Sequence, residues 1–305
     1  MLRFVVGKIV MAALVALTVS IISFSLLHLS GDPAVAMAGE NANDAAIQAI
    51  RETYGFDRPL IVQYGDWLFS ALRGDFGESY YFRMPVTQII ADRLQITMLL
   101  GLLSITFALV LSIPLGVAAA LRPNSLVDRA ALFVSVVGQA IPSFWFGLIL
   151  IVVFAIDLRL LPASGAKSWT GFVLPTIVLG YYATPAIMRL TRTGMLDVLS
   201  ADYVRTARAK GLPARKVIFK HALRNAIIPV VSLAAVQMGF MLGGSVVVES
   251  VFALHGAGYL AWESISRNDL PTMQALVLIF SMFYIAFTVL ADILNAWLDP
   301  RLRVA

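Results

Sequence analysis

Long stretches without a single charged residue are the feature that most constrains how this chain can fold. A helix that crosses about 30 Å of hydrocarbon needs roughly 20 apolar residues at 1.5 Å per residue. Six stretches reach that length, at residues 9–29, 94–121, 130–156, 169–188, 226–248 and 270–291. Because lipid offers the backbone no hydrogen-bond partners, the pattern predicts an all-α polytopic membrane protein with six transmembrane helices.

The overall composition agrees with this prediction. Charged residues make up 13% of the 305 residues and the mean hydropathy is +0.84, whereas soluble domains are about a quarter charged. The first stretch is too long for a cleaved signal peptide, whose apolar run is about 7 to 15 residues, so we expect it to stay as a span. The absence of cysteine excludes disulfides, thiolate metal sites and cysteine nucleophiles.

The basic residues indicate how the spans are oriented. Nine of the 23 Lys and Arg residues fall in one segment, 189–225. They are Arg189, Arg192, Arg205, Arg208, Lys210, Arg215, Lys216, Lys220 and Arg224. Since loops rich in Lys and Arg stay in the cytoplasm, alternating the six spans from this segment predicts that both termini are cytoplasmic.

We expect one transmembrane domain, 1–305, with a core at about 94–298, an extracytoplasmic segment 30–93 and the cytoplasmic loop 189–225. Within the extracytoplasmic segment, apolar side chains recur at helical spacing. These are Leu60, Tyr64, Trp67, Leu68 and Ala71. Two interpretations stay open: an interfacial helix that lies on the bundle, or a docking surface for a soluble partner.

The predicted spans hold no charged residue away from their ends. Carriers driven by ion gradients usually bury such residues, so the pattern argues against that class. Pro114, Pro142, Pro185 and Pro229 are expected to break spans or begin them. Four polar residues are candidates for the substrate pathway, although each can equally hydrogen-bond between helices. They are Gln139, Ser143, Thr184 and Gln237.

The cytoplasmic loop reads as two short helices joined by a corner. Tyr203, Val204 and Ala207 fall on one face of the first helix, and Gly211 followed by Pro213 specifies a sharp turn. The second helix carries basic residues at four-residue steps. One interpretation is a topological anchor held to anionic lipid. The other is insertion into a groove on a protein partner.

The stretch "DYVRTARAKGLPARKVIFKHALRNAIIP" resembles the cytoplasmic loop of type I ABC importer permeases, in the branch that imports dipeptides, oligopeptides and nickel. In that superfamily Glu-Ala-Ala, three residues and Gly form a coupling helix that seats in a cleft of the ATPase subunit. Aligned on Gly211, Arg205 stands at the Glu and Thr206 and Ala207 at the two Ala positions. The stretch "YGFDRPLIVQYGDWLFSALRGDFGESY" also resembles this branch, while His255 replaces its usual Pro.

The resemblance implies a type I ABC importer transmembrane fold in a bacterial cytoplasmic (inner) membrane. It implies as partners a second homologous permease subunit, two cytoplasmic ATPase subunits, an extracytoplasmic solute-binding protein and membrane lipids, with no nucleic acid. It also implies a set of residues that couple the chain to the ATPase. They are Asp202, Tyr203, Val204, Arg205, Thr206, Ala207, Lys210 and Gly211.

The expected function is transport rather than catalysis. No G-x-x-x-x-G-K-[ST] phosphate loop occurs, so we expect no enzyme activity, no catalytic or metal site and no cofactor in this chain, with ATP and Mg²⁺ bound by partner ATPase subunits. Peptides delivered by an external binding protein are the favoured solute, because peptide importers form the larger share of the branch. Nickel or another small solute is the alternative, and an ATPase-independent channel is the second alternative.

Overall fold

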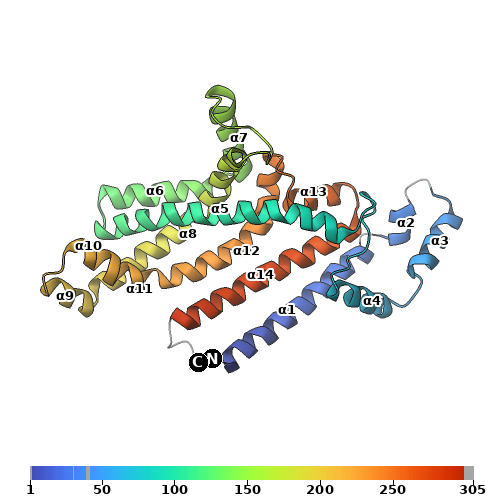
Figure 1. Ribbon diagram of the computed structural model, residues 1–305, viewed down its shortest axis with the longest axis horizontal. Helices are drawn as coiled ribbons and strands as arrows, with labels where there is room; N and C mark the ends of the chain where they lie inside the picture. Colours follow the sequence, from blue (N-terminus) through green and yellow to red (C-terminus); the bar gives the residue numbers. More distant parts are fainter. Residues whose placement is uncertain (1, 30, 39–41, 299–305) are drawn as a thin grey trace.

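The computed structural model describes residues 2–29, 31–38 and 42–298, and within these ranges it is almost entirely helical. The helices form an elongated bundle whose long members run roughly along one axis (Figure 1). Five of them are long and apolar enough to cross a membrane, judged by length and composition. They are α1 (Leu2–Leu29), α5 (Val86–Leu121), α8 (Val173–Ser200), α12 (Ile228–Val251) and α14 (Leu270–Leu298).

Shorter elements join these helices. Between α1 and α5 lie α2 (Pro33–Ala38), α3 (Asp44–Tyr54) and α4 (Leu60–Leu72). Between α5 and α8 lie α6 (Leu126–Ala140), α7 (Ser143–Leu150), the π-helix η1 (Ile151–Asp157) and the 3₁₀-helix η2 (Trp169–Phe172). Between α8 and α14 lie α9 (Asp202–Ala209), α10 (Ala214–Lys216), the π-helix η3 (Val217–Leu223), α11 (Arg224–Ala226) and, after α12, α13 (Ala257–Ser266). We call the two ends of the bundle the α9 end and the α13 end.

Helices α5 and α8 make the most extensive contact of any two helices in the described ranges. A Cβ atom on Gly180 would lie 2.5 Å from the carbonyl oxygen of Ser104, and one on Gly116 would lie 2.8 Å from that of Met188. Both positions therefore require glycine for the backbones to approach. The expectation that Pro114 and Pro185 break spans is wrong, because α5 and α8 each continue through their proline.

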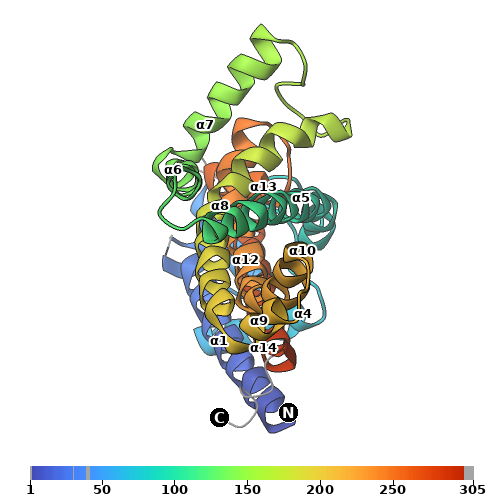
Figure 2. The same cartoon turned by 90° about the vertical axis from the view of Figure 1, so that its left-hand side faces the viewer.

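The third predicted span, 130–156, is not one helix. It is divided at Ile141, whose extended backbone precedes Pro142, because a residue before proline is pushed out of the helical region. The segment from α7 to η1 then leaves the bundle sideways (Figures 1 and 2). At about 1.5 Å per residue, neither piece reaches the length of a span. The count of six spans stays a prediction.

The helix predicted within residues 30–93 is confirmed as α4, which packs on α1. The hydroxyls of Tyr64 and Ser20 are 2.8 Å apart, and the Tyr64 ring meets Phe24 edge-on with centroids 5.4 Å apart. The opposite face of α4 is exposed, with Ile61 77% accessible. The structure thus shows a helix lying on the bundle, which agrees with the first of the two interpretations.

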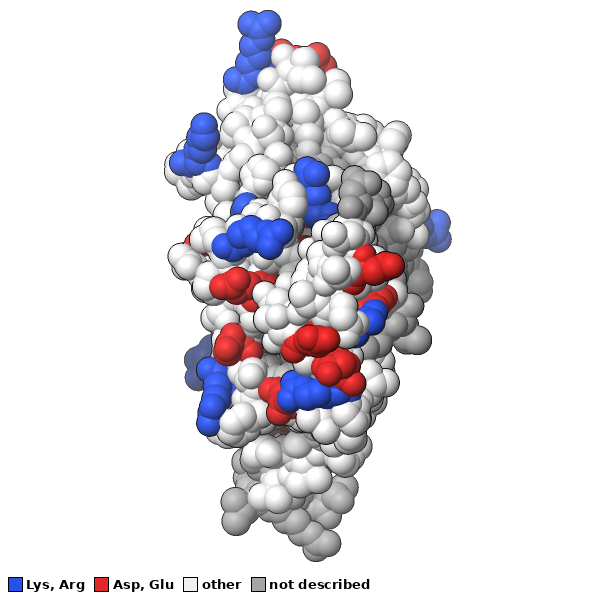
Figure 3. Space-filling model, turned by 90° about the vertical axis from the view of Figure 1, so that its right-hand side faces the viewer, with Lys and Arg blue, Asp and Glu red and all other residues white. Residues whose placement is uncertain are grey.

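A carboxylate ties the preceding helices together. Arg51 of α3 pairs with Asp32, which also accepts a hydrogen bond from the backbone of Ala34 in α2 at 2.9 Å. The Arg51 guanidinium holds the pKa of Asp32 below its usual range. Acidic and basic side chains are interspersed over this end of the molecule (Figure 3).

Glu249 lies just past the predicted end of its span at 248, near the end of α12, which continues to Val251. Its side chain is fully buried, and both carboxylate oxygens accept hydrogen bonds. Thr97 of α5 donates its hydroxyl to Oε1 at 2.7 Å, and the backbone N–H of Tyr259 in α13 donates to Oε2 at 2.8 Å. Thr97 in turn accepts from the N–H of Ala257 at 2.8 Å. One acidic side chain therefore joins α5, α12 and α13.

Asp269 makes a second buried junction at the same end. Its carboxylate accepts hydrogen bonds from the Ser79 hydroxyl, from the backbone N–H of Tyr80 at 2.9 Å and from the Thr272 hydroxyl at 2.7 Å. Burial raises the pKa of the Tyr80 phenol above its usual value, and the charge of Asp269 adds to that shift. The loop before α5 is thereby fastened to the start of α14.

Candidate functional site

The corner after α9 forms as the sequence predicts. The last turn of α9 is followed by Gly211 in the left-handed region, with φ of 72°, and its N–H donates to the carbonyl of Arg208 at 2.9 Å. Pro213 is the N-cap residue of α10, which begins at Ala214. A residue with a Cβ would be strained at Gly211, so glycine sets the direction of the corner.

The inner face of α9 is fixed to the bundle. Val204 and Ala207 are buried, and they pack with Val217 of η3 in one apolar cluster. Both residues belong to the predicted ATPase-coupling set. Their burial means that they hold α9 in place and do not form a surface that a partner can touch.

The outer face of α9 is open to solvent. Tyr203 is 44% accessible, and its hydroxyl accepts a hydrogen bond from the Asn225 side chain at 2.8 Å. Arg205 and Asp202 form an exposed ion pair at 3.3 Å. The six exposed members of the predicted set are Asp202, Tyr203, Arg205, Thr206, Lys210 and Gly211.

The second helix of the loop is not a separate short helix. It runs as α10, η3 and α11 and passes through Ile227 into α12. Because α9 packs on Val217 at the start of this run, the apolar cluster links α9 mechanically to α12. The sequence pattern identified the corner but not the continuity with the next long helix.

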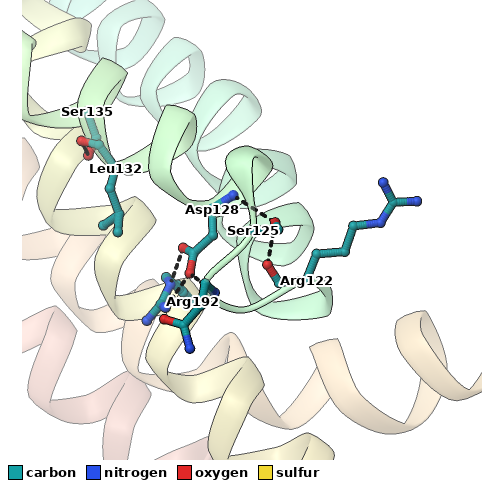
Figure 4. A network of polar contacts seen from close by, with 7 residues as sticks. Arg122, Ser125, Asp128, Leu132, Ser135 and Arg192 are labelled. Carbon is teal, nitrogen blue, oxygen red and sulfur yellow. Dashed lines mark hydrogen bonds and ion pairs between the residues drawn. The ribbon is translucent and has the colours of Figure 1, made fainter.

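The end of α8 also differs from the prediction. The predicted span stops at 188, yet α8 continues to Ser200 and carries Arg192 into a bidentate ion pair with Asp128 of α6, both contacts at 2.7 Å (Figure 4). Asp128 is buried and also accepts from the N–H of Asn124. The Arg192 guanidinium holds the pKa of Asp128 below its usual range.

The predicted pathway residues largely come together. Gln139, Ser143 and Gln237 line a cavity of about 620 Å³ between α6, α7, α8 and α12. We call it the α8–α12 cavity. Tyr182, which the sequence analysis did not select, adds a fourth polar group. Thr184 lies elsewhere, fully buried, with its hydroxyl donating to the carbonyl of Gly180 at 3.2 Å.

Within the described ranges, no group of three or more His, Cys, Asp or Glu side chains is placed to hold a metal ion. The two parts of the molecule that stand out are therefore the exposed face of α9 and the α8–α12 cavity.

Solved structures define the class of protein. The fold is similar to that of the inward-facing MetNI methionine ABC transporter, with a TM-score of 0.57 at 16% identity, covering 70% of this chain and 97% of that one. It is also similar to an amino acid ABC transporter crystallised with histidines, with a TM-score of 0.53 at 15% identity, covering 69% and 94%. The fold is that of ABC importer permeases, as predicted, while the count of six spans and the cytoplasmic location of the termini stay predictions.

The chain belongs to the binding-protein-dependent transport system inner membrane component family, whose model matches residues 112–304. A model of the N-terminal part of such membrane components matches residues 1–101. The glutathione transport system permease proteins GsiC of Escherichia coli (strain K12) and of Salmonella typhi are each 40% identical over 304 residues, 99% of each chain. The chain is therefore a multi-pass permease of the bacterial inner membrane, as the resemblance predicted.

Proposed function

We propose that this chain forms half of the translocation pathway of an ATP-driven importer for peptides. A second homologous permease forms the other half, two cytoplasmic subunits hydrolyse ATP, and an extracytoplasmic binding protein delivers the solute. The observation that carries this proposal is the exposure of the predicted coupling residues, which lie in α9 and the two positions after it. Six of the eight are exposed, while Val204 and Ala207 anchor α9. A helix that presents one face and buries the other is suited to transmit force from a partner.

A peptide solute is supported by two observations. The relatives are named for transport of glutathione, which is a tripeptide. In the α8–α12 cavity, the amides of Gln139 and Gln237 and the hydroxyl of Ser143 are able to donate and accept hydrogen bonds, as a peptide backbone requires. Apolar neighbours such as Phe240 accommodate side chains of different kinds.

The segment from α7 to η1 supports the pairing with a second permease. It leaves the bundle (Figure 1), and Phe144, Trp145 and Leu148 are each about half exposed on it. A short apolar helix that stands away from its own bundle gains packing when a second bundle covers it. We place the sister permease against this segment.

The proposed mechanism follows the contacts. Closure of the ATPase pair displaces α9, and the packing of Val204 and Ala207 on Val217 carries that displacement into α12. Since α12 forms one wall of the α8–α12 cavity, its movement against α8 opens the cavity to one side of the membrane or the other. This is a rigid-body switch between two arrangements of packed helices.

The experiment compares Thr206→Trp, on the exposed face of α9, with Leu126→Trp, at the first residue of α6, which is 83% exposed. The complex, co-expressed with its candidate partners and reconstituted in vesicles with ATP, is tested for uptake of a labelled tripeptide. We expect Thr206→Trp to reduce uptake about 30-fold, the loss of about 2 kcal/mol typical of a central contact. Leu126→Trp should retain uptake. Equal uptake by both variants, with assembly intact, contradicts a coupling role for α9.

The substrate part of the proposal has its own test. Gln237→Leu removes a polar group from the α8–α12 cavity, whereas Thr184→Val changes a buried residue that does not line it. We expect Gln237→Leu to weaken the apparent affinity for the tripeptide about fivefold, roughly 1 kcal/mol for one hydrogen bond. Thr184→Val should leave that affinity unchanged. Weaker affinity in Thr184→Val together with unchanged affinity in Gln237→Leu would show that the substrate does not pass through this cavity.

A further inference from the structure

The α9 end carries a hollow of about 510 Å³ that gathers basic side chains. We call it the basic hollow. It lies between α9, the run from η3 to α12 and the end of α14. Its lining consists of Tyr203, Lys220, His221, Arg224, Asn225, Ile228, Trp297 and Leu298. None of these lining residues is acidic.

The cations of the basic hollow are not neutralised within the part of the chain that the structure describes. Lys220 and Arg224 are four residues apart and exposed, and neither makes an ion pair with a described residue. Arg192, by contrast, is neutralised within the chain, because it forms an ion pair with Asp128. Two like charges held around one hollow repel each other, and an anion placed between them relieves that repulsion.

The other wall of the basic hollow is apolar. Trp297 and Leu298 end the apolar helix α14, and Ile228 begins the apolar helix α12. Tryptophan beside cations at the end of a membrane-crossing helix is typical of the level of the lipid headgroups. A free phosphate would contact only the cations, whereas a phospholipid would contact both walls.

We propose that the basic hollow binds the phosphate of an acidic phospholipid, with Lys220 and Arg224 on the phosphate and Trp297 beside the glycerol and acyl region. The inference rests on the proposed cytoplasmic location of the α9 end, where acidic lipids attract basic segments. Tyr203 of α9 lines the hollow, and its hydroxyl accepts a hydrogen bond from Asn225. The bound lipid therefore also stabilises the position of α9. The lipid thereby becomes part of the surface that α9 presents.

The test measures lipid binding directly. The whole complex, purified in neutral detergent, is titrated with phosphatidylglycerol, and bound lipid is counted by native mass spectrometry. The variant Lys220→Gln/Arg224→Gln is compared with Arg215→Gln/Lys216→Gln, which removes the same charge from the same segment outside the hollow. We expect the first variant to bind about 25-fold more weakly, about fivefold for each lost cation, and the second to bind as the unmodified protein does.

Further arms of the experiment separate the possible sources of the signal. Phosphatidylcholine should bind weakly, and inorganic phosphate should fail to displace phosphatidylglycerol. Equal weakening in both variants, displacement by inorganic phosphate, or binding that appears only after the ATPase subunits are stripped away would each overturn the proposal. The binding assay needs no transport, so loss of peptide uptake leaves it unaffected. Because the chain has no cysteine, thiol labelling of Lys216→Cys from each side of the membrane tests the orientation separately.

Discussion

The two ends of the molecule use polar side chains in opposite ways. At the α13 end, Glu249 and Asp269 are buried, and each accepts hydrogen bonds from separate segments. At the α9 end, the Arg205–Asp202 pair and Lys220 lie in solvent. Buried, satisfied networks make a structure rigid, whereas exposed charges add little stability and stay free for partners. The polar side chains of the α13 end therefore stabilise the fold, whereas those of the α9 end are accessible to a partner.

The Asp128–Arg192 pair shows that burial, rather than position, decides between the two uses. It lies near the α9 end, yet Asp128 is only 2% exposed and both oxygens accept from the guanidinium (Figure 4). The pair fastens α6 to α8 as Glu249 fastens α5 to α13. Variants at four positions test the comparison, beginning with the largest expected effect.

Removal of the Asp269 carboxylate should have the largest effect on stability. Asp269→Ala leaves the donors of Ser79, Tyr80 and Thr272 buried without their acceptor. We expect a loss of about 4 kcal/mol in the free energy of unfolding, since each orphaned donor costs about 1 to 3 kcal/mol. Denaturant unfolding in detergent measures it. Asp75→Ala, at an exposed carboxylate of the same end, is the control, and equal losses would contradict the role of burial.

Glu249→Gln should have an intermediate effect. The amide keeps the shape of the side chain but places an N–H₂ group against either the N–H of Tyr259 or the Thr97 hydroxyl that now donates to Glu249. One donor then faces another, and we expect a loss of about 2 kcal/mol. A stability equal to that of the unmodified protein would show that this junction is not needed in the folded state.

Acidification should weaken the Asp128–Arg192 pair. The pKa of Asp128 is lowered in the folded protein, so its contribution is present above the unfolded pKa of about 4 and is lost as the pH falls through the folded value. Between pH 6 and pH 3, unmodified protein should therefore lose about 1 kcal/mol more stability than Asp128→Asn. Thermal unfolding over this pH range gives the comparison. Equal losses of stability in both proteins would show that the ion pair does not stabilise the fold.

Arg205→Ala should have the smallest effect on stability. Its pair with Asp202 is exposed, with side-chain accessibilities of 72% and 93%, so we expect a change of about 0.5 kcal/mol or less. The same variant should reduce the amount of ATPase subunit that co-purifies with the permease. A large loss of stability with unchanged co-purification of the ATPase subunit would show that Arg205 stabilises the fold and does not contact a partner.

The sequence predicted well where a property is local. Uninterrupted apolar stretches identify the five long helices, the spacing of Leu60 and Tyr64 identifies α4, and Gly211 with Pro213 identifies the corner after α9. Each of these signals lies within a few neighbouring residues. The fold class and the backbone geometry of the corner after α9 were therefore predictable, while the roles of the candidate site residues stay predictions.

The errors fall where a charged side chain is paired or hydrogen-bonded by a residue that is distant in the sequence. The predicted spans stop before Arg189 and Glu249, because a charge usually marks the exit from the membrane. The helices nevertheless continue, since Arg192 meets Asp128 across 64 residues and Glu249 meets Thr97 across 152. Nothing local distinguishes such a charge from one that faces water. Likewise, Pro114 and Pro142 look alike in sequence, although only Pro142 ends a helix.

The central claim is that the exposed face of α9 contacts an ATPase subunit, and site-specific cross-linking tests it most directly. The chain has no cysteine, so each variant carries a single thiol. Thr206→Cys places it on the exposed face of α9, Val204→Cys on the buried face of α9, and Ala45→Cys on α3. Each variant is co-expressed with the ATPase subunits, and a photo-reactive reagent is attached to its thiol. We predict a cross-link to the ATPase from Thr206→Cys alone. Co-purification of the ATPase without that cross-link, or an equal yield from Ala45→Cys, would contradict the claim.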